Sequence, residues 1–86
     1  MTYAEEKEKK ILDTIYWHFM YNYRIEWNED GTELVITGKH NDIYISISAG
    51  GYLSVVVDQP FSEKSYFVFD TTTPKALEFI LEELEK

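Results

Sequence analysis

The spacing of apolar residues changes twice along this chain, and these changes constrain its fold more than any other feature. From about residue 2 to residue 21, apolar side chains recur every three or four positions, which is typical of one buried stripe on a helix. Over residues 23–69 the period is two, as in strands with one buried face. Helical spacing returns after Thr73-Pro74, where Thr73 can cap a helix and Pro74 suits its first turn.

Turn signals divide the middle region into five predicted strands. Asp30-Gly31 is a strong hairpin signal, and Gly38 and Gly50-Gly51 mark the next two turns. The predicted strands are residues 23–27, 34–37, 43–48, 53–57 and 66–69. Short turns favour pairing between consecutive strands. The sequence therefore predicts one α+β domain over residues 1–86, a five-stranded antiparallel meander sheet with an N-terminal and a C-terminal helix packed on one face.

The same pattern predicts which surfaces are covered. The fifth strand is apolar on both sides, which indicates a central strand or one that is covered twice. Phe79 falls on the outer side of the closing helix, where it would be exposed. Glu83 and Glu85 are expected at a frayed, solvated C-terminal end.

The composition favours a folded domain in a reducing compartment. Of the 86 residues, 44% are hydrophobic and 16% are aromatic, and aromatic burial helps a short chain to offset its conformational entropy. There is no cysteine, which excludes a disulfide scaffold and thiolate zinc sites. No apolar run approaches the roughly 20 residues that span a bilayer, and the charged N-terminal segment is unlike a secretory signal. We expect a cytoplasmic protein with no membrane partner.

The charge is strongly acidic. Sixteen acidic residues against eight basic ones give a formal net charge of −8. Such a field repels nucleic acid, which is bound through clustered lysines and arginines, and it attracts basic protein surfaces. The sequence therefore predicts a protein partner with a basic surface and no direct nucleic-acid binding. The alternative is that the acidity serves solubility alone.

The sequence contains no recognisable active-site motif. His18 lies in a predicted helix and His40 in a turn, and the nearby Asp42 is explained by the chemistry of that turn. The chain lacks a Gly-rich phosphate loop, a His-Glu-x-x-His pattern and a calcium-loop spacing. We therefore predict a non-enzymatic protein with no cofactor and no metal site.

Acidic residues gather in two places that are candidates for partner binding. The first cluster surrounds the first hairpin and the second shares one side of the last helix; they are Glu26, Glu29, Asp30 and Glu33, and Glu78 and Glu82. Like charges at such spacing cost a few tenths of a kcal/mol. They therefore either serve binding or are tolerated on a solvated surface.

Aromatic residues supply further candidates. Trp17 and Tyr21 fall away from the buried stripe of the first helix, and an exposed Trp–Tyr pair is typical of interface anchors. The alternatives are a helix buried on two sides, a helix that ends before Tyr21, or rings folded back onto the core. Tyr44 belongs, with Tyr52 and Tyr66, to a serine-rich sheet face that is a second candidate surface.

Together these features predict an acidic, inhibitor-like protein that occupies a basic surface of a partner protein, including one meant for nucleic acid. In size and charge the chain resembles small phage-encoded inhibitors such as anti-CRISPR and DNA-mimic proteins. Electrostatic attraction would speed association, and the aromatic anchors would slow dissociation. Two alternatives remain: a homodimeric adaptor or chaperone whose outer helix faces meet, and a domain that binds a small ligand between helices and sheet.

Overall fold

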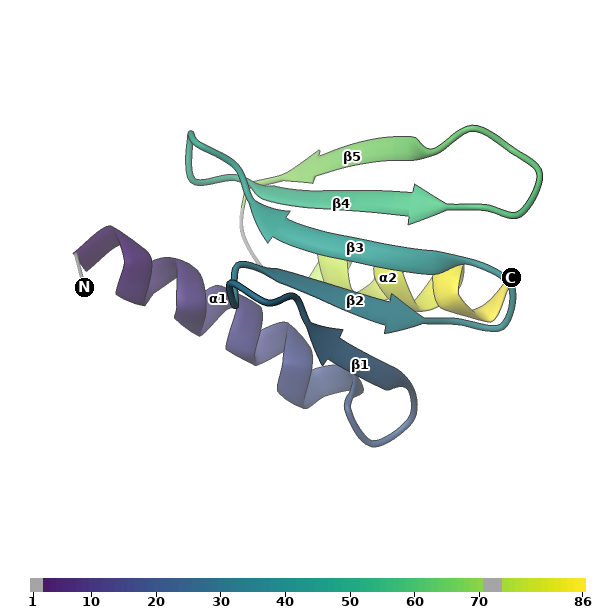
Figure 1. Ribbon diagram of the computed structural model, residues 1–86, viewed down its shortest axis with the longest axis horizontal. Helices are drawn as coiled ribbons and strands as arrows, with labels where there is room; N and C mark the ends of the chain where they lie inside the picture. Colours follow the sequence, from purple (N-terminus) through teal and green to yellow (C-terminus); the bar gives the residue numbers. More distant parts are fainter. Residues whose placement is uncertain (1–2, 71–73) are drawn as a thin grey trace.

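The computed structural model describes residues 3–70 and 74–86, and within them it confirms the predicted α+β architecture (Figure 1). The elements are α1 (Tyr3–Phe19), β1 (Arg24–Trp27), β2 (Glu33–Thr37), β3 (Asp42–Ile47), β4 (Leu53–Asp58), β5 (Ser65–Phe69) and α2 (Pro74–Glu85). The predicted cap Thr73 lies outside the described residues. Neither α1 nor α2, as described, combines the length and the apolar character needed to cross a membrane.

The strands form one antiparallel sheet in the order β1-β2-β3-β4-β5, which is the predicted meander. Ile36 lies opposite Ile43, and Ile45 lies opposite Val55, so the register gathers apolar residues on one face. The buried core comprises Leu12, Ile15, Phe19, Leu34, Ile36, Ile43, Ile45, Leu53, Val55, Val57, Ala76, Ile80 and Leu84. A slip of one residue would turn each strand's core residues to the opposite face, so burial fixes this register.

Both helices contribute to this one core and therefore cover the same face of the sheet. In Figure 1, α2 lies behind β2 and β3, and α1 runs beside β1. The opposite face carries no described helix. A row of side chains crosses it from edge to edge, comprising Glu26, Val35, Tyr44, Val56 and Tyr66.

Two local predictions are wrong, and both concern β5. This strand is neither central nor covered twice: it is the edge strand beyond β4, and Tyr66 and Val68 are 72% and 64% exposed. Phe79 does not project from the outer side of α2. Its ring packs against Phe67 and Phe69, with centroid distances of 4.6 and 5.5 Å, because the edge strand leaves that flank of the helix open to aromatic packing.

The C-terminal end of α2 is held by the turn between β2 and β3, so the expected fraying is wrong, whereas Glu85 is exposed as expected. The Lys39 backbone N–H donates to the Leu84 carbonyl at 2.9 Å, and the Asn41 side-chain amide donates to the Glu83 carbonyl at 3.2 Å. Glu83 itself is buried, 7% exposed. The last carbonyls of a helix lack partners within the helix, and here the turn supplies them.

Candidate functional site

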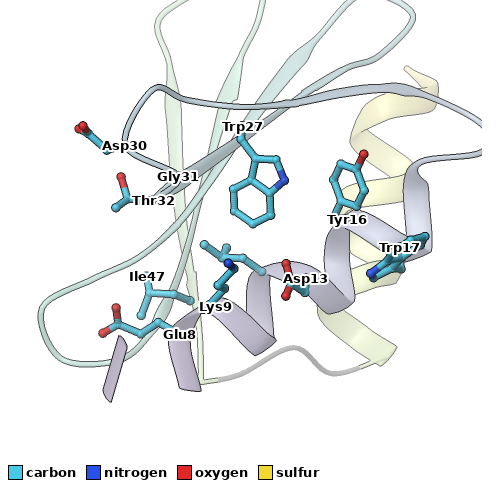
Figure 2. Close-up of a pocket in the computed structure, with 11 residues that line it drawn as sticks. Glu8, Lys9, Asp13, Tyr16, Trp17, Trp27, Asp30, Gly31, Thr32 and Ile47 are labelled. Carbon is cyan, nitrogen blue, oxygen red and sulfur yellow. The ribbon is translucent and has the colours of Figure 1, made fainter. Parts of the chain in front are cut away.

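A groove of about 920 Å³ opens between α1, the β1–β2 hairpin and the end of β3 (Figure 2). We call it the acidic groove; the described residues that line it are Glu8, Lys9, Leu12, Asp13, Tyr16, Trp17, Trp27, Asp30, Gly31, Thr32 and Ile47. It lies at the edge of the sheet, where Tyr16 of α1 packs against Trp27, the last residue of the four-residue edge strand β1. The groove is thus built from both a helix and the sheet.

Three aromatic rings form one wall of the acidic groove. Tyr16 stacks on Trp27 with ring centroids 6.0 Å apart and an interplanar angle of 24°. Trp17 meets Tyr16 edge to face, with centroids 5.8 Å apart. Tyr16 and Trp27 are half-buried, whereas Trp17 is 60% exposed. Mutual packing orders these rings before any ligand arrives, which lowers the entropy cost of binding to them.

The charged groups of the groove are mostly carboxylates. Glu8 and Asp13 come from α1, and Asp30 comes from the hairpin turn; Lys9 is the one described cation in the lining. Figure 2 shows Lys9 pointing toward the Trp27 side of the groove, between Glu8 and Asp13. The formal charge of the lining is therefore two units negative, in line with the acidity of the whole chain.

The hairpin turn that carries Asp30 is held by Asn28. The Asn28 side-chain oxygen accepts hydrogen bonds from the backbone N–H groups of Thr32 at 2.8 Å and Glu33 at 3.1 Å. Gly31 has a φ of 70°, a conformation that glycine adopts without the penalty other residues pay. The turn therefore fixes one rim of the groove, although its residues are exposed.

The arrangement suits a cation with an apolar stem. Aromatic faces attract ammonium and guanidinium groups, and the rim carboxylates add charge-assisted hydrogen bonds. Neither His18 nor His40 lines the groove, and the His40 ring nitrogen instead lies 2.9 Å from the Lys86 carbonyl oxygen. Among the side chains that the structure describes, no group of three or more histidines or carboxylates is placed to hold a metal ion.

The structure brings two predicted binding residues, Trp17 and Asp30, into this groove. Glu29 precedes Asp30 in the same exposed turn. Tyr21 is 82% exposed but lies in the turn after α1, outside the groove lining. The alternative in which the helix ends before Tyr21 is confirmed, because α1 ends at Phe19. Exposure of both rings excludes the alternatives in which they are buried, and their binding role stays a prediction.

The other predicted residues lie on different surfaces. Glu26, Glu33 and Tyr44 share the open sheet face, where Arg24 pairs with Glu26 at 2.8 Å and the Lys64 ammonium lies 5.5 Å from the centre of the Tyr44 ring. Glu78 and Glu82 are exposed on α2, on the opposite side of the sheet. The predicted residues therefore do not form one continuous site.

Of the groove residues, sequence reasoning found only Trp17 and Asp30; those that it missed include Glu8, Asp13, Tyr16 and Trp27. Tyr16 and Trp27 match the periods of the buried stripe and strand, so a linear pattern assigns them to the core. Their partial exposure depends on the crossing of α1 over the sheet edge. Glu8 and Asp13 look like ordinary solvated helix residues until the hairpin is placed opposite them.

A second, shallower hollow is closed by its own side chains. The Tyr23 hydroxyl donates a hydrogen bond to the Glu85 carboxylate, and the Lys39 ammonium lies 3.1 Å from the same carboxylate. The hydrogen bond to Glu85 raises the pKa of Tyr23, and the bonds from Tyr23 and Lys39 lower the pKa of Glu85. These contacts join the residue before β1 to the end of α2. We therefore assign this hollow a structural role rather than a binding role.

Comparison of the chain with family models, with curated proteins and with solved structures finds no match. Fold and site together define an acidic α+β domain with an aromatic, carboxylate-rimmed groove at one edge of its sheet.

Proposed function

We propose that this protein is a non-enzymatic, inhibitor-like binder that takes a lysine- or arginine-bearing segment of a partner protein into the acidic groove. The observation that carries the proposal is the packed row of three rings, Trp27, Tyr16 and the largely exposed Trp17, in a groove whose lining also includes Asp13 and Asp30. Figure 2 shows Asp30 on the far rim, across the groove from Trp17. By occupying a basic surface, the protein would compete with nucleic acid for its partner. The absence of cysteine suits action in the cytoplasm.

The energetic case combines two terms. A guanidinium stacked on an indole contributes about 0.5–2 kcal/mol, with the larger values where water is excluded. Each exposed carboxylate–cation pair adds about 0.2–1 kcal/mol and is screened by salt. The net charge of −8 raises the encounter rate with any basic surface, while the ordered rings slow dissociation.

Intrinsic fluorescence reports on this site directly, because the chain has two tryptophans and both line the groove. We expect titration with an arginine–serine peptide of about ten residues to change the indole emission in a saturable way, and a glutamate–serine peptide of equal length to leave it unchanged. Raising the salt concentration should weaken binding of the arginine peptide. An emission that does not respond to the arginine peptide would remove the groove as its binding site.

A matched pair of double variants separates the groove from general acidity. D13N/D30N and E78Q/E82Q each remove two negative charges, but only the first pair lines the groove. We expect D13N/D30N to lower the affinity for the arginine peptide roughly 3- to 10-fold, and E78Q/E82Q to change this affinity by less than about twofold. Equal effects of the two variants would mean that net charge, rather than the groove, attracts the peptide.

Lys9 provides a test with the opposite sign. Its ammonium already points into the groove, where it repels an incoming cation and competes for the same carboxylates. We expect K9Q to bind the arginine peptide roughly 2- to 5-fold more tightly than the unmodified protein. A weaker complex would contradict the proposal that Lys9 competes with the arginine side chains for the carboxylates of the groove.

A further inference from the structure

The outer edge of β5 is a sheet edge that is neither covered nor charged. Within the described residues it has no strand or helix beyond it, as Figure 1 shows for the strand at the margin of the sheet. No charged residue occurs between Lys64 and Asp70, and Tyr66, Phe67 and Val68 are 72%, 36% and 64% exposed. Soluble proteins normally protect such edges with charge, proline, bulges or a covering segment, because a free edge pairs with other strands.

The other sheet edge, β1, shows that protection. It is four residues long, and Arg24 and Glu26 form an ion pair on its open face. α1 also runs beside it (Figure 1). The contrast singles out β5 as the edge that is open to pairing.

The hydrogen-bond parity of the sheet shows which groups β5 offers. Ser48 donates its N–H to the Tyr52 carbonyl at 2.8 Å, so Ser48 and Tyr52 are a hydrogen-bonded pair, and such pairs alternate along the β3–β4 ladder. It follows that Val55 bonds toward β5, where it pairs with Phe67. The N–H and C=O groups of Tyr66 and Val68 therefore point outward from the sheet.

We infer that β5 pairs antiparallel with β5 of a second copy of this chain, with the twofold axis at Phe67. In this register Tyr66 of each copy lies opposite Val68 of the other, and both residues present their outward backbone groups to one another. Phe67 faces Phe67 of the second copy as a non-hydrogen-bonded pair, in which side chains approach most closely. The two sheets then form one continuous sheet.

Charge selects this register over its neighbours. Lys64 and Asp70 stand three residues on either side of Phe67, so the twofold axis brings Lys64 of each copy against Asp70 of the other. A shift of the axis to Tyr66 or Val68 keeps the hydrogen-bond parity but sets a charged residue against an uncharged one. The edge is thus complementary to itself in backbone groups, apolar side chains and charge, as a twofold interface requires.

The aromatic contacts on the helix side fit the same axis. Phe67 already packs on Phe79 of α2, with centroids 4.6 Å apart, so the second copy's Phe67 would extend an existing aromatic cluster. The open side gains a patch of Tyr66 and Val68 from both copies. This interface is separate from the acidic groove at the opposite edge of the sheet, so the inference does not rest on the proposed function.

Sedimentation velocity on the full chain, at protein concentrations up to about 0.5 mM, tests the inference. We expect a monomer–dimer equilibrium in the unmodified protein. V68P removes one outward N–H without touching the ladder to β4, since proline is tolerated at such edge positions, and it should weaken the dimer at least tenfold. W17S alters a ring on α1 that is also largely exposed, and it should leave the dimer unchanged. Circular dichroism should confirm that each variant is folded.

A charge swap keeps the test decisive even if V68P fails to fold. K64D and D70K each place like charges across the interface and should weaken self-association roughly tenfold. The double variant K64D/D70K should recover it, and a mixture of the two single variants should form a heterodimer. A protein that remains monomeric at all concentrations, a dimer lost in W17S, or a swap without recovery would each overturn the inference.

Discussion

Replacement of Gly38 by alanine is the sharpest test of how this fold is held together. Gly38 lies in the β2–β3 turn that holds the end of α2. A Cβ atom at this position would lie 2.7 Å from the Asn41 carbonyl oxygen, 2.8 Å from the Leu84 carbonyl oxygen and 2.9 Å from the Leu84 Cα. All three are backbone atoms, so no side chain can rotate away, and either the turn or the helix must move.

The size of the effect follows from what that movement breaks. Overpacking a tight contact costs about 1–3 kcal/mol, and each lost backbone or amide hydrogen bond about 0.5–1.5 kcal/mol. The bonds at risk are those from Lys39 to Leu84 and from Asn41 to Glu83. We expect G38A to lower the free energy of unfolding by about 2–4 kcal/mol, which lowers Tm by roughly 10–25 °C in a domain of this size.

Urea and thermal unfolding followed by circular dichroism measure this change, with G50A as the matched control. A Cβ at Gly50 would meet only the Tyr52 ring, at 3.1 Å, and that side chain is 47% exposed and free to shift. We therefore expect G50A to cost less than about 1 kcal/mol. If G38A unfolds at the same urea concentration as G50A, the close approach of the turn to α2 does not hold in solution.

Two further predictions concern the groove rim and the Tyr23–Glu85 contact. N28A removes the side-chain acceptor for the Thr32 and Glu33 N–H groups, so it should lower the free energy of unfolding measured in urea by about 1–2 kcal/mol. A decrease below about 0.3 kcal/mol would show that water replaces this acceptor. Because the pKa of Glu85 is lowered, its stabilising contribution is complete above the ordinary carboxylate pKa and is lost as pH falls through the lowered pKa. The pKa of Tyr23 is raised, so the contribution is also lost as pH rises through the raised pKa. Y23F should therefore flatten both limbs of the stability–pH profile, and an unchanged profile would refute this linkage.

The type and order of the elements could be read from the sequence because each depends on local periodicity. The alternation in β2, β3 and β4 has one apolar face, and short turns such as Asp30-Gly31 leave antiparallel pairing as the simple solution. The stripe of α2, with Ala76, Ile80 and Leu84 buried, is likewise set by residue spacing.

The errors arise where burial depends on position in the sheet. The alternation in β5 is apolar on both sides, which suits a central strand, yet the meander places it at the edge, where Val68 is exposed. Phe79 lies outside the main stripe of α2 and is half-buried because Phe67 and Phe69 come from that edge strand. The spacing of apolar residues in a strand does not indicate whether further strands lie beside it in the sheet.

The sequence by itself determined the acidity of this protein and its helix–sheet–helix order, because charge and spacing are properties of the linear chain. It left open whether Trp17 is exposed, and the structure decides that. Tertiary structure decided that Trp17, Trp27 and Asp30 share one groove, that Glu26 and Glu78 lie on opposite sides of the sheet, and that β5 has a free edge. The first relation depends on how α1 crosses the edge of a twisted sheet, and the other two depend on the strand order and on the face that α2 covers. All three are set by packing between residues distant in sequence.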